Sequence, residues 1–338
     1  MLSLEKSVCY PLFFTPLYKQ AIWGGALLST LGRDLPQYDI PIGESWEIVD
    51  RPDSQSYVSN GFFAGKTLRE LIEEDPEGIV GRGHRADVPF PLLLKIIDAD
   101  KDLSLQIHPN EESCKYLKGA EPKNEMWYVL DHRNGAEIMA GINEDVSEEL
   151  FNSVIGQKAI KHFMKTYQST KGNSFYIKAA TMHAIGGGNL IYEIQQNSDT
   201  TYRVSDWGRQ NLNGVSRELH LQEAQICLKN SQDSKPAKNV DTNSETSFKL
   251  NLESSLNVKN LVCSNYFKVD EFTLDGELSV NKPTESFETL FSIDNDLKIK
   301  CEGISYFLKR GSTCLIPARL KNYQIHSSTE TSFIRARL

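Results

Sequence analysis

Apolar and polar residues alternate along many short stretches of this chain. In LSLQIHP, residues 103–109, aliphatic side chains occupy every second position, and Ser104, Gln106 and His108 stand between them. Because a β-strand sends successive side chains to opposite faces, this pattern predicts a strand with one apolar and one polar face. The polar face could lie in solvent at a sheet edge, or it could line a pocket.

Similar stretches separated by Gly and Asn turns recur along the chain and predict a β-sandwich or barrel. Further strands are expected at 91–98, 124–131, 136–142, 173–180, 189–197 and 200–207. Helical spacing is confined to a few places. Residues 66–75 and 110–117 each predict one helix, and residues 147–167 predict two short helices interrupted near Gly156.

A polar stretch divides the chain. Residues 229–247, KNSQDSKPAKNVDTNSETS, have the composition of a linker or a long exposed loop. We therefore expect one domain over 1–235, which includes the short helices, and a second β domain over 236–338.

The two halves share a weak internal echo of strand, polar turn and strand. GNSFYIKAATMHAI in the first half resembles GSTCLIPARLKNYQI in the second. His183 lies eleven residues after Gly172, and the residue eleven positions after Gly311 is Asn322. The echo predicts a second copy of the barrel without a histidine at that place, although chance similarity between two β-rich stretches would look the same.

Composition narrows the class of protein. The 338 residues are 39% hydrophobic and 24% charged, and the net charge of -8 argues against nucleic acid as a partner. We expect no membrane span, because no apolar run approaches the roughly 20 residues that a membrane helix needs. Six scattered cysteines without a C-x-x-C pair, and an N-terminus without signal-peptide features, predict a cytoplasmic protein with free thiols.

Three residues could form a metal site. His108 lies on the polar face of its strand, His183 lies in the glycine-rich turn TMHAIGGG, and Glu125 lies on a strand in PKNEMWYVLD. Two imidazoles and one carboxylate suit zinc and leave a position open, and Gln106 could add a neutral oxygen. The same set also fits non-haem iron, and a polar rim at a barrel mouth is the structural alternative.

A second row of polar residues points to an anionic ligand. Glu193 and two amides alternate onto one face, and Arg203 and Asp206 follow after a turn. Carboxylates and amides bind hydroxyl groups, and a guanidinium binds a phosphate or an oxyanion. The pattern favours a polyhydroxylated, anionic ligand over a solvated strand face with a structural Arg–Asp pair.

Taken together, these segments resemble the type I mannose-6-phosphate isomerases (phosphomannose isomerases), most closely the short bacterial form. The matching stretches occur in the family's order and cover most of residues 11–210. They are IWGG (22–25), GESWEI (43–48), LSLQIHP (103–109), PKNEMWYV (122–129), MHAIGGG (182–188) and EIQQNSDTTYRVSDWGR (193–209).

The resemblance implies a mainly β fold. It would consist of a cupin-type jelly-roll barrel with a small helical portion, followed by a second, degenerate cupin-like barrel. One zinc per chain would be bound by Gln106, His108, Glu125 and His183.

The resemblance also implies the roles of other residues. Arg203 matches the family's essential arginine, and Lys123 matches the lysine two residues before the ligand glutamate. Glu193 and Asp199 match acidic residues of the same pocket, and Lys95 and Ser104 are possible substrate-binding residues. The chain lacks the large helical insertion of the fungal and animal enzymes, which weakens any transfer of phosphate-binding residues.

The implied reaction interconverts mannose 6-phosphate and fructose 6-phosphate through an enediol, with a small sugar phosphate as the partner. Either Glu193 or Lys123 could be the base, and the residues leave this choice open. Two other functions are compatible with the pocket: an iron-dependent cupin oxidoreductase and a non-catalytic sugar-phosphate sensor. The sequence does not indicate the oligomeric state.

Overall fold

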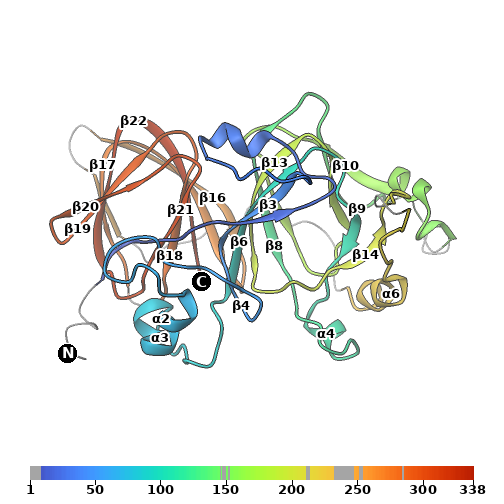
Figure 1. The fold of residues 1–338 in the computed structure, drawn as a ribbon, viewed down its shortest axis with the longest axis horizontal. Helices are drawn as coiled ribbons and strands as arrows, with labels where there is room; N and C mark the ends of the chain where they lie inside the picture. Colours follow the sequence, from blue (N-terminus) through green and yellow to red (C-terminus); the bar gives the residue numbers. More distant parts are fainter. Residues whose placement is uncertain are drawn as a thin grey trace. The chain divides into compact units, whose positions relative to one another are not determined.

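The chain divides into two compact units. The computed structural model describes residues 9–144, 146, 150, 153–210, 214–231, 247–250, 254–283 and 285–338. One unit comprises Tyr18–Trp46 and Leu94–Ala237, and the other comprises Met1–Leu17, Glu47–Leu93 and Lys238–Leu338. Both units are built mainly from strands, as the sequence predicted (Figure 1). We call their strand-built parts the first barrel and the second barrel.

The compact units do not follow the expected division into 1–235 and 236–338 throughout. Residues 1–17 and 47–93 group with the C-terminal half of the chain. One reason is strand pairing, because β1 (Leu12–Phe13) pairs with β21 (Thr313–Ile316) in the sheet of the second barrel. A pairing across some 300 residues leaves no mark in local composition.

Two sheets form the first barrel. One has the strand order β10-β9-β12-β7-β14 and the other has the order β11-β8-β13-β6-β3-β2. The strands are β2 (Leu17–Gln20), β3 (Ile42–Ile48), β6 (Leu92–Ala99), β7 (Leu105–Ile107), β8 (Glu125–His132), β9 (Glu137–Ile142), β10 (Met164–Gln168), β11 (Ser174–Ile177), β12 (His183–Ile185), β13 (Asn189–Gln196) and β14 (Tyr202–Ser205).

The alternation in LSLQIHP places its apolar face in the core. Leu105 and Ile107 are fully buried in β7 and pack in an apolar cluster with Met139 and Val204. Leu103 belongs to a neighbouring cluster. The polar side chains of this strand are therefore left to the opposite face of the sheet, as period-2 alternation requires.

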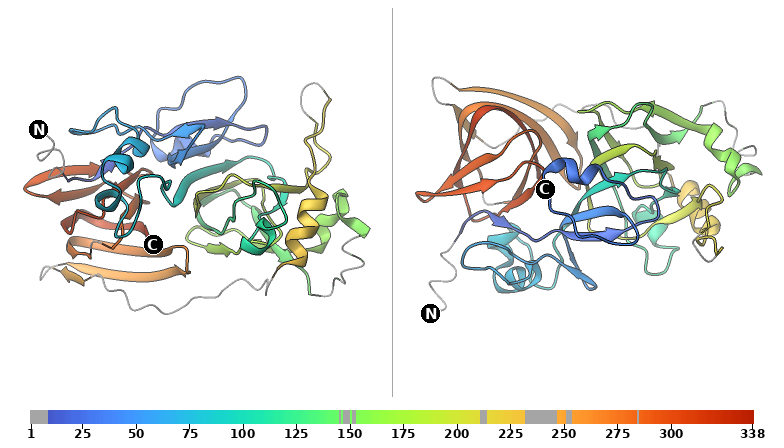
Figure 2. Two further views of the ribbon diagram at one scale, coloured as in Figure 1. Left: turned by 90° about the horizontal axis from the view of Figure 1, so that it is seen from below. Right: turned by 45° about the horizontal axis from the view of Figure 1, so that its top comes forward.

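The described strands of the second barrel form a nine-stranded sheet, and all of them except the N-terminal β1 are orange to red in Figure 2. Two long strands, β17 and β22, pair along most of their length. Besides β1 and β21, its strands are β15 (Ser247–Leu250), β16 (Ser255–Cys263), β17 (Lys268–Asn281), β18 (Glu288–Ser292), β19 (Leu297–Cys301), β20 (Ile304–Leu308) and β22 (Asn322–Arg337). A separate two-stranded ribbon pairs β4 (Asp50–Arg51) with β5 (Ser54–Gln55).

The strand order agrees in large part with the internal echo. The second barrel contains the orders β20-β19-β22-β17-β15 and β21-β18-β22-β17-β16. If β22 takes the place of β12 and β13, and β17 that of β6 and β7, these orders match the five-stranded sheet of the first barrel and five strands of its six-stranded sheet. β2 has no counterpart, and β15 comes first in its half of the chain whereas β14 comes last. The glycines that begin the echo, Gly172 and Gly311, both have positive φ, and each donates its N–H to the neighbouring strand.

Helices are short and lie between the strands. The helix expected at 66–75 is α2 (Leu68–Glu74), which begins with a capping box between Thr67 and Glu70, and α3 (Pro76–Ile79) follows it. The helix expected at 110–117 is α4 (Glu111–Cys114), with Asn110 as its N-cap. The remaining helices with described bounds are η1 (Leu27–Leu31), η2 (Lys158–Phe163) and α6 (Leu221–Lys229).

The prediction of two helices over 147–167 was wrong for residues 164–167, although the second predicted helix is present as the 3₁₀ helix η2. A 3₁₀ helix ends at Phe163, and the residues after it form β10, which pairs with β9. Thr166 and Tyr167 favour a strand, and cross-strand pairing with Met139 and Ile138 outweighed the helical spacing. Most of the first predicted helix lies outside the described residues.

Other expectations concern the linker, the cysteines and the membrane. Most of the predicted linker, residues 232–246, lies outside the described residues, and α6 continues to Lys229. All six cysteines are described and are free thiols. No helix in the described part of the chain is long and apolar enough to cross a membrane.

Candidate metal centre and pocket

Strand pairing in the first barrel brings distant polar residues into one row. Gln106 of β7 lies opposite His183 of β12 on one side and opposite Arg203 of β14 on the other. Residues directly opposite each other in an antiparallel pair have side chains on the same face. The register therefore places an amide, an imidazole and a guanidinium side by side across three strands.

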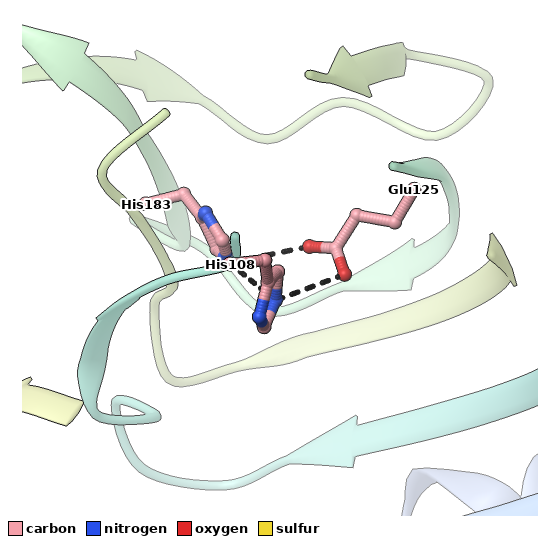
Figure 3. A group of neighbouring side chains, drawn as sticks. All are labelled: His108, Glu125 and His183. Carbon is pink, nitrogen blue, oxygen red and sulfur yellow. Dashed lines mark hydrogen bonds and ion pairs between the residues drawn. The ribbon is translucent and has the colours of Figure 1, made fainter. Parts of the chain in front are cut away.

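His108, Glu125 and His183 form a buried group (Figure 3). His108 Nε2 lies 3.2 Å from Glu125 Oε2, His183 Nε2 lies 3.2 Å from Glu125 Oε1, and the two Nε2 atoms are 3.1 Å apart. At most 1% of each side chain is exposed. Within the described residues this is the one group of three or more histidines, cysteines or acids whose atoms are close enough to hold a metal ion.

Hydrogen bonds on the far side of each imidazole fix the tautomers. His108 Nδ1 lies 2.9 Å from the carbonyl oxygen of Thr200, and His183 Nδ1 lies 2.8 Å from that of Thr181. A carbonyl oxygen only accepts, so each Nδ1 carries the proton and each Nε2 presents a lone pair to the group. Backbone carbonyls hold metal-binding histidines in this way.

The electrostatics of the group favour a bound cation. Burial and the charge of Lys123 lower the pKa of His108 to about 3, and burial also lowers the pKa of His183. Burial opposes ionisation of Glu125, but Lys123 and the two histidines outweigh it and lower the pKa of this carboxyl well below its usual value. Two neutral imidazoles and a carboxylate are the protonation states that a metal ion requires.

The carboxylate itself lacks donors. Both oxygens of Glu125 are buried and accept no hydrogen bond from the described residues. The ammonium of Lys123 lies 3.1 Å from Oε2 and 3.2 Å from His108 Nε2, but it does not hydrogen-bond the carboxylate. A buried carboxylate without donors is costly, and a metal ion would remove that cost. The residues present therefore fit a metal ion.

Gln106 completes one side of the group with its amide. Its Nε2 lies 3.3 Å from His183 Nε2, and its Oε1 accepts a 3.4 Å hydrogen bond from Ser104. A half-turn of the amide would exchange the nitrogen and the oxygen. The expected role of Gln106 as an oxygen ligand remains a prediction, while its position beside the group is established.

A cavity of about 320 Å³ lies beside this group, because Gln106 and Lys123, which contact its side chains, also line the cavity. His108, Glu125 and His183 do not line it themselves. The cavity has the size of a small-molecule site and is lined mainly by polar and charged side chains. Seven of the residues singled out from the sequence line it: Lys95, Ser104, Gln106, Lys123, Glu193, Asp199 and Arg203. Their roles remain predictions, but the structure brings all of them to one pocket.

A chain of buried charges forms one wall of the cavity. Lys95 Nζ lies 3.5 Å from Glu44 Oε2 and 3.5 Å from Glu193 Oε2. Burial opposes the charge of Lys95, but the two carboxylates outweigh it and raise its pKa. Burial and the charge of Glu125 raise the pKa of Glu193, and Lys95 opposes them. Burial also opposes ionisation of Glu44, but Lys95 and the indole of Trp46 outweigh it and lower the pKa of Glu44. The pKa values of the two carboxyls are therefore shifted in opposite directions.

Tryptophan indoles hold both carboxylates in place. Trp46 Nε1 donates to Glu44 Oε2 at 2.6 Å, and Trp127 Nε1 donates to Glu193 Oε1 at 2.8 Å. Each acid therefore keeps one oxygen fixed by an indole. A carboxylate that is oriented in this way needs little reorganisation to take part in proton transfer.

The sequence interpretation missed several residues of the cavity. Glu44 and Trp46 alternate within GESWEI, so their shared face was visible, although nothing assigned it to this pocket. Arg217 follows β14 in a segment without periodicity and gave no signal. The other lining residues that were not predicted are Trp23, Ile97, Leu103, Trp127, Ile185 and Thr201.

A pair of related barrels, of which the first holds a buried His–Glu–His group, defines the class as a two-barrel cupin with a candidate metal site. Residues 12–148 match the family "Phosphomannose isomerase type I, catalytic domain", and residues 257–336 match "Mannose-6-phosphate isomerase, cupin domain". Both matches agree with the predicted fold class.

Individual proteins are similar over nearly the whole chain. The mannose-6-phosphate isomerase ManA of Bacillus subtilis is 34% identical, over 95% of this chain and 97% of its own. The mannose-6-phosphate isomerase of Streptococcus mutans is 33% identical, over 95% and 96%. The crystal structure of a Bacillus subtilis mannose 6-phosphate isomerase superimposes with a TM-score of 0.80 at 31% identity, over 97% of this chain and 99% of that one. The chain belongs to the type I phosphomannose isomerases.

Proposed function

We propose that the protein is a zinc-dependent isomerase that interconverts mannose 6-phosphate and fructose 6-phosphate through an enediol. The observation that carries the proposal is that Lys123, Glu193 and Arg203 line one cavity, and that Lys123 of this cavity also contacts the His–Glu–His group. The substrate of the similar bacterial isomerases supports the choice of sugar phosphate.

Zinc is the metal that we propose for the group. His108, His183 and Glu125 would bind it, and Gln106 would add an oxygen after rotation of its amide. Nitrogen and carboxylate ligands in this number suit zinc and leave a coordination position free. When bound, the metal would act as a Lewis acid toward the carbonyl and hydroxyl oxygens of the sugar.

Glu193 is the base that we propose, in preference to Lys123. A base must take the C2 proton of the open-chain aldose and return a proton to C1, so that no atom is gained or lost. Glu193 Oε1 is held by Trp127, and Oε2 lies beside Lys95 at the cavity wall. Burial raises its pKa, which makes the carboxylate a stronger base. Lys123 is already engaged with Glu125 and His108.

The remaining charged residues would stabilise the enediol and orient the sugar. Arg203 lies opposite Gln106 in the strand register, so its guanidinium could offset negative charge that develops on the sugar oxygens. We assign Ser104, Lys95 and Asp199, which line the same cavity, to contacts with the sugar hydroxyls.

A coupled assay for fructose 6-phosphate formed from mannose 6-phosphate tests the proposal. We expect turnover that is lost on chelation and restored by zinc. Oxygen consumption with sugar substrates would instead support the iron oxidoreductase. Binding of mannose 6-phosphate without turnover would support the sensor, against which the acid and lysine of the cavity already argue.

A further inference from the structure

A cluster of three arginines and one acid lies beside the cavity. Arg217 binds Asp206 in a bidentate pair: its Nε donates to Oδ2 at 2.8 Å and its Nη2 donates to Oδ1. Arg209 also donates to Asp206, from Nε and Nη2. Burial opposes ionisation of Asp206, but these arginines outweigh it and lower its pKa. We call Arg203, Asp206, Arg209 and Arg217 the arginine cluster.

The segment that carries Arg217 is fastened to Arg203. The backbone N–H of His220 donates to the carbonyl of Arg203 at 2.8 Å, and the backbone N–H of Arg203 donates to His220 Nδ1 at 3.1 Å. The side chain of Arg203 donates from Nη1 to the carbonyl of Glu218 at 3.0 Å. Burial and the charge of Arg217 lower the pKa of Arg203, so the two guanidiniums act on each other.

Two of the three arginines face the cavity. Arg203 and Arg217 line it, whereas Arg209 does not. Arg209 is engaged with Asp206 and with the carbonyl of Asp102, which gives it a structural role. In contrast, Arg203 Nε is buried and has no hydrogen-bond partner, and Arg217 Nη1 has none among the described residues. Donors therefore remain available at the cavity wall.

The charge of the cluster matches that of a phosphomonoester. Three guanidiniums share one hydrogen-bonded carboxylate, so the cluster carries an excess of about two positive charges. A phosphate ester carries roughly 1.5 to 2 negative charges at neutral pH. Guanidinium forks bind such groups through paired hydrogen bonds.

We propose that Arg217 binds the phosphate group of the substrate, that Arg203 adds its charge between this point and the metal centre, and that Asp206 positions Arg217. The inference rests on the proposed function, because it takes the substrate to be a sugar phosphate. It assigns a role to a residue that the sequence pattern had not singled out. The sequence allowed Asp206 to be a structural partner of Arg203. In this proposal Asp206 instead holds the side chain of Arg217, which binds the phosphate.

The test compares Arg217→Gln with the wild-type enzyme in two measurements. For mannose 6-phosphate we expect KM to rise roughly a hundredfold, since a charged hydrogen-bond partner is lost, while kcat changes by no more than about threefold. Inorganic phosphate should inhibit the wild type competitively, and its inhibition constant should rise at least tenfold in the variant. Arg217→Lys should fall between the two, because lysine keeps the charge but not the fork.

Arg133→Gln is the matched control. Arg133 lies in the same unit, is half-exposed, pairs with Asp100 and does not line the cavity. Its variant should keep the wild-type KM and the wild-type inhibition by phosphate.

Two results would overturn the inference. One is a KM and a phosphate inhibition constant within twofold of wild type in Arg217→Gln. The other is an equal rise of both constants in Arg217→Gln and in the control Arg133→Gln. If Arg217→Gln does not fold, Arg217→Lys decides alone, and a KM within twofold of wild type contradicts the inference. A wild type without isomerase activity would refute the proposed function instead. Calorimetry of inorganic phosphate binding would then still test this site. Weaker binding to Arg217→Lys than to the wild type would support it, and equal binding would contradict it.

Discussion

The two barrels share one strand order but differ in what neutralises a buried carboxylate. In the first barrel Glu125 lies opposite Ile177, and in the second Glu288 lies opposite Ile316. The interval from Ile177 to Ile316 is the interval of the echo from His183 to Asn322. Glu288 is therefore the counterpart of Glu125, and the second barrel has kept the acid.

The partners of the two acids are different. Glu288 Oε1 accepts a 3.0 Å hydrogen bond from Arg335, and its Oε2 accepts a 2.5 Å hydrogen bond from Tyr323. Arg335 also pairs with Asp270 at 2.8 Å. Burial opposes the charge of Arg335, but the two acids outweigh it and raise its pKa.

The comparison shows what makes a metal site from a buried acid. Glu288 has an internal cation and two donors, so its charge is balanced by the protein itself. Glu125 also has an internal cation, Lys123, but it accepts no hydrogen bond in the described residues and faces two imidazole lone pairs, so its oxygens remain available to a metal ion. The residues around the acid, rather than the barrel or the acid alone, decide whether a metal binds.

The largest effect should follow from removing a histidine of the first barrel. His108→Ala or His183→Ala should lose the bound metal and lower kcat/KM at least about a thousandfold, because the Lewis acid is lost with the ligand. Metal analysis and the isomerase assay on the same sample measure both. His162→Ala, an exposed histidine in the same unit, is the control. A metal-free His183→Ala protein with full activity would refute the site.

Removing the arginine beside the metal centre should separate chemistry from metal binding. Arg203→Ala should keep one metal per chain and lose roughly a hundredfold to a thousandfold in kcat/KM, the cost of deleting a group that stabilises developing charge. Steady-state kinetics and metal content decide the outcome. An unchanged kcat/KM would exclude the role assigned to Arg203.

The corresponding acid of the second barrel should matter for stability alone. Glu288→Gln leaves Arg335 with one fewer charge partner in a buried position, so we expect about 3 kcal/mol of destabilisation, seen as a lower unfolding midpoint. Metal content and kcat should stay at the wild-type values. A loss of metal in this variant would show that the comparison between the barrels is wrong.

Restoring the missing histidine should have the smallest effect. Asn322 is exposed at the start of β22, and Arg335 already balances Glu288. Asn322→His should therefore leave the metal content at one per chain. A second stoichiometric metal in this variant would mean that the histidine alone, rather than the charge balance, distinguishes the barrels.

Local alternation predicted most of the strands, and helices were found within 66–75 and 110–117, where helical spacing predicted them. What local pattern could not predict was long-range pairing. The strand β1 joins the second barrel across the chain, and β10 replaced the end of a predicted helix because its partner β9 was available. Periodicity describes one segment at a time, whereas these outcomes depend on two.

The site shows the same limit. The polar face of LSLQIHP and the residues in familiar motifs were visible, and the structure brings them to one cavity. Arg217 was not visible, because it lies in a segment without periodicity and only the fold brings it to Asp206 and the cavity. Nor could the sequence show that Glu288 kept the position of Glu125, since only the strand register aligns the two.

Zinc titration of the metal-free protein tests the central claim most directly. Chelated protein would receive zinc in steps, while the isomerisation of mannose 6-phosphate is followed at each step. Activity should rise in proportion to added zinc and level off at one zinc per chain, because only the first barrel holds a buried acid without hydrogen-bond donors beside two histidines, in the described residues. Full activity after complete removal of metal, or a rise that continues to two zinc ions per chain, would contradict this account.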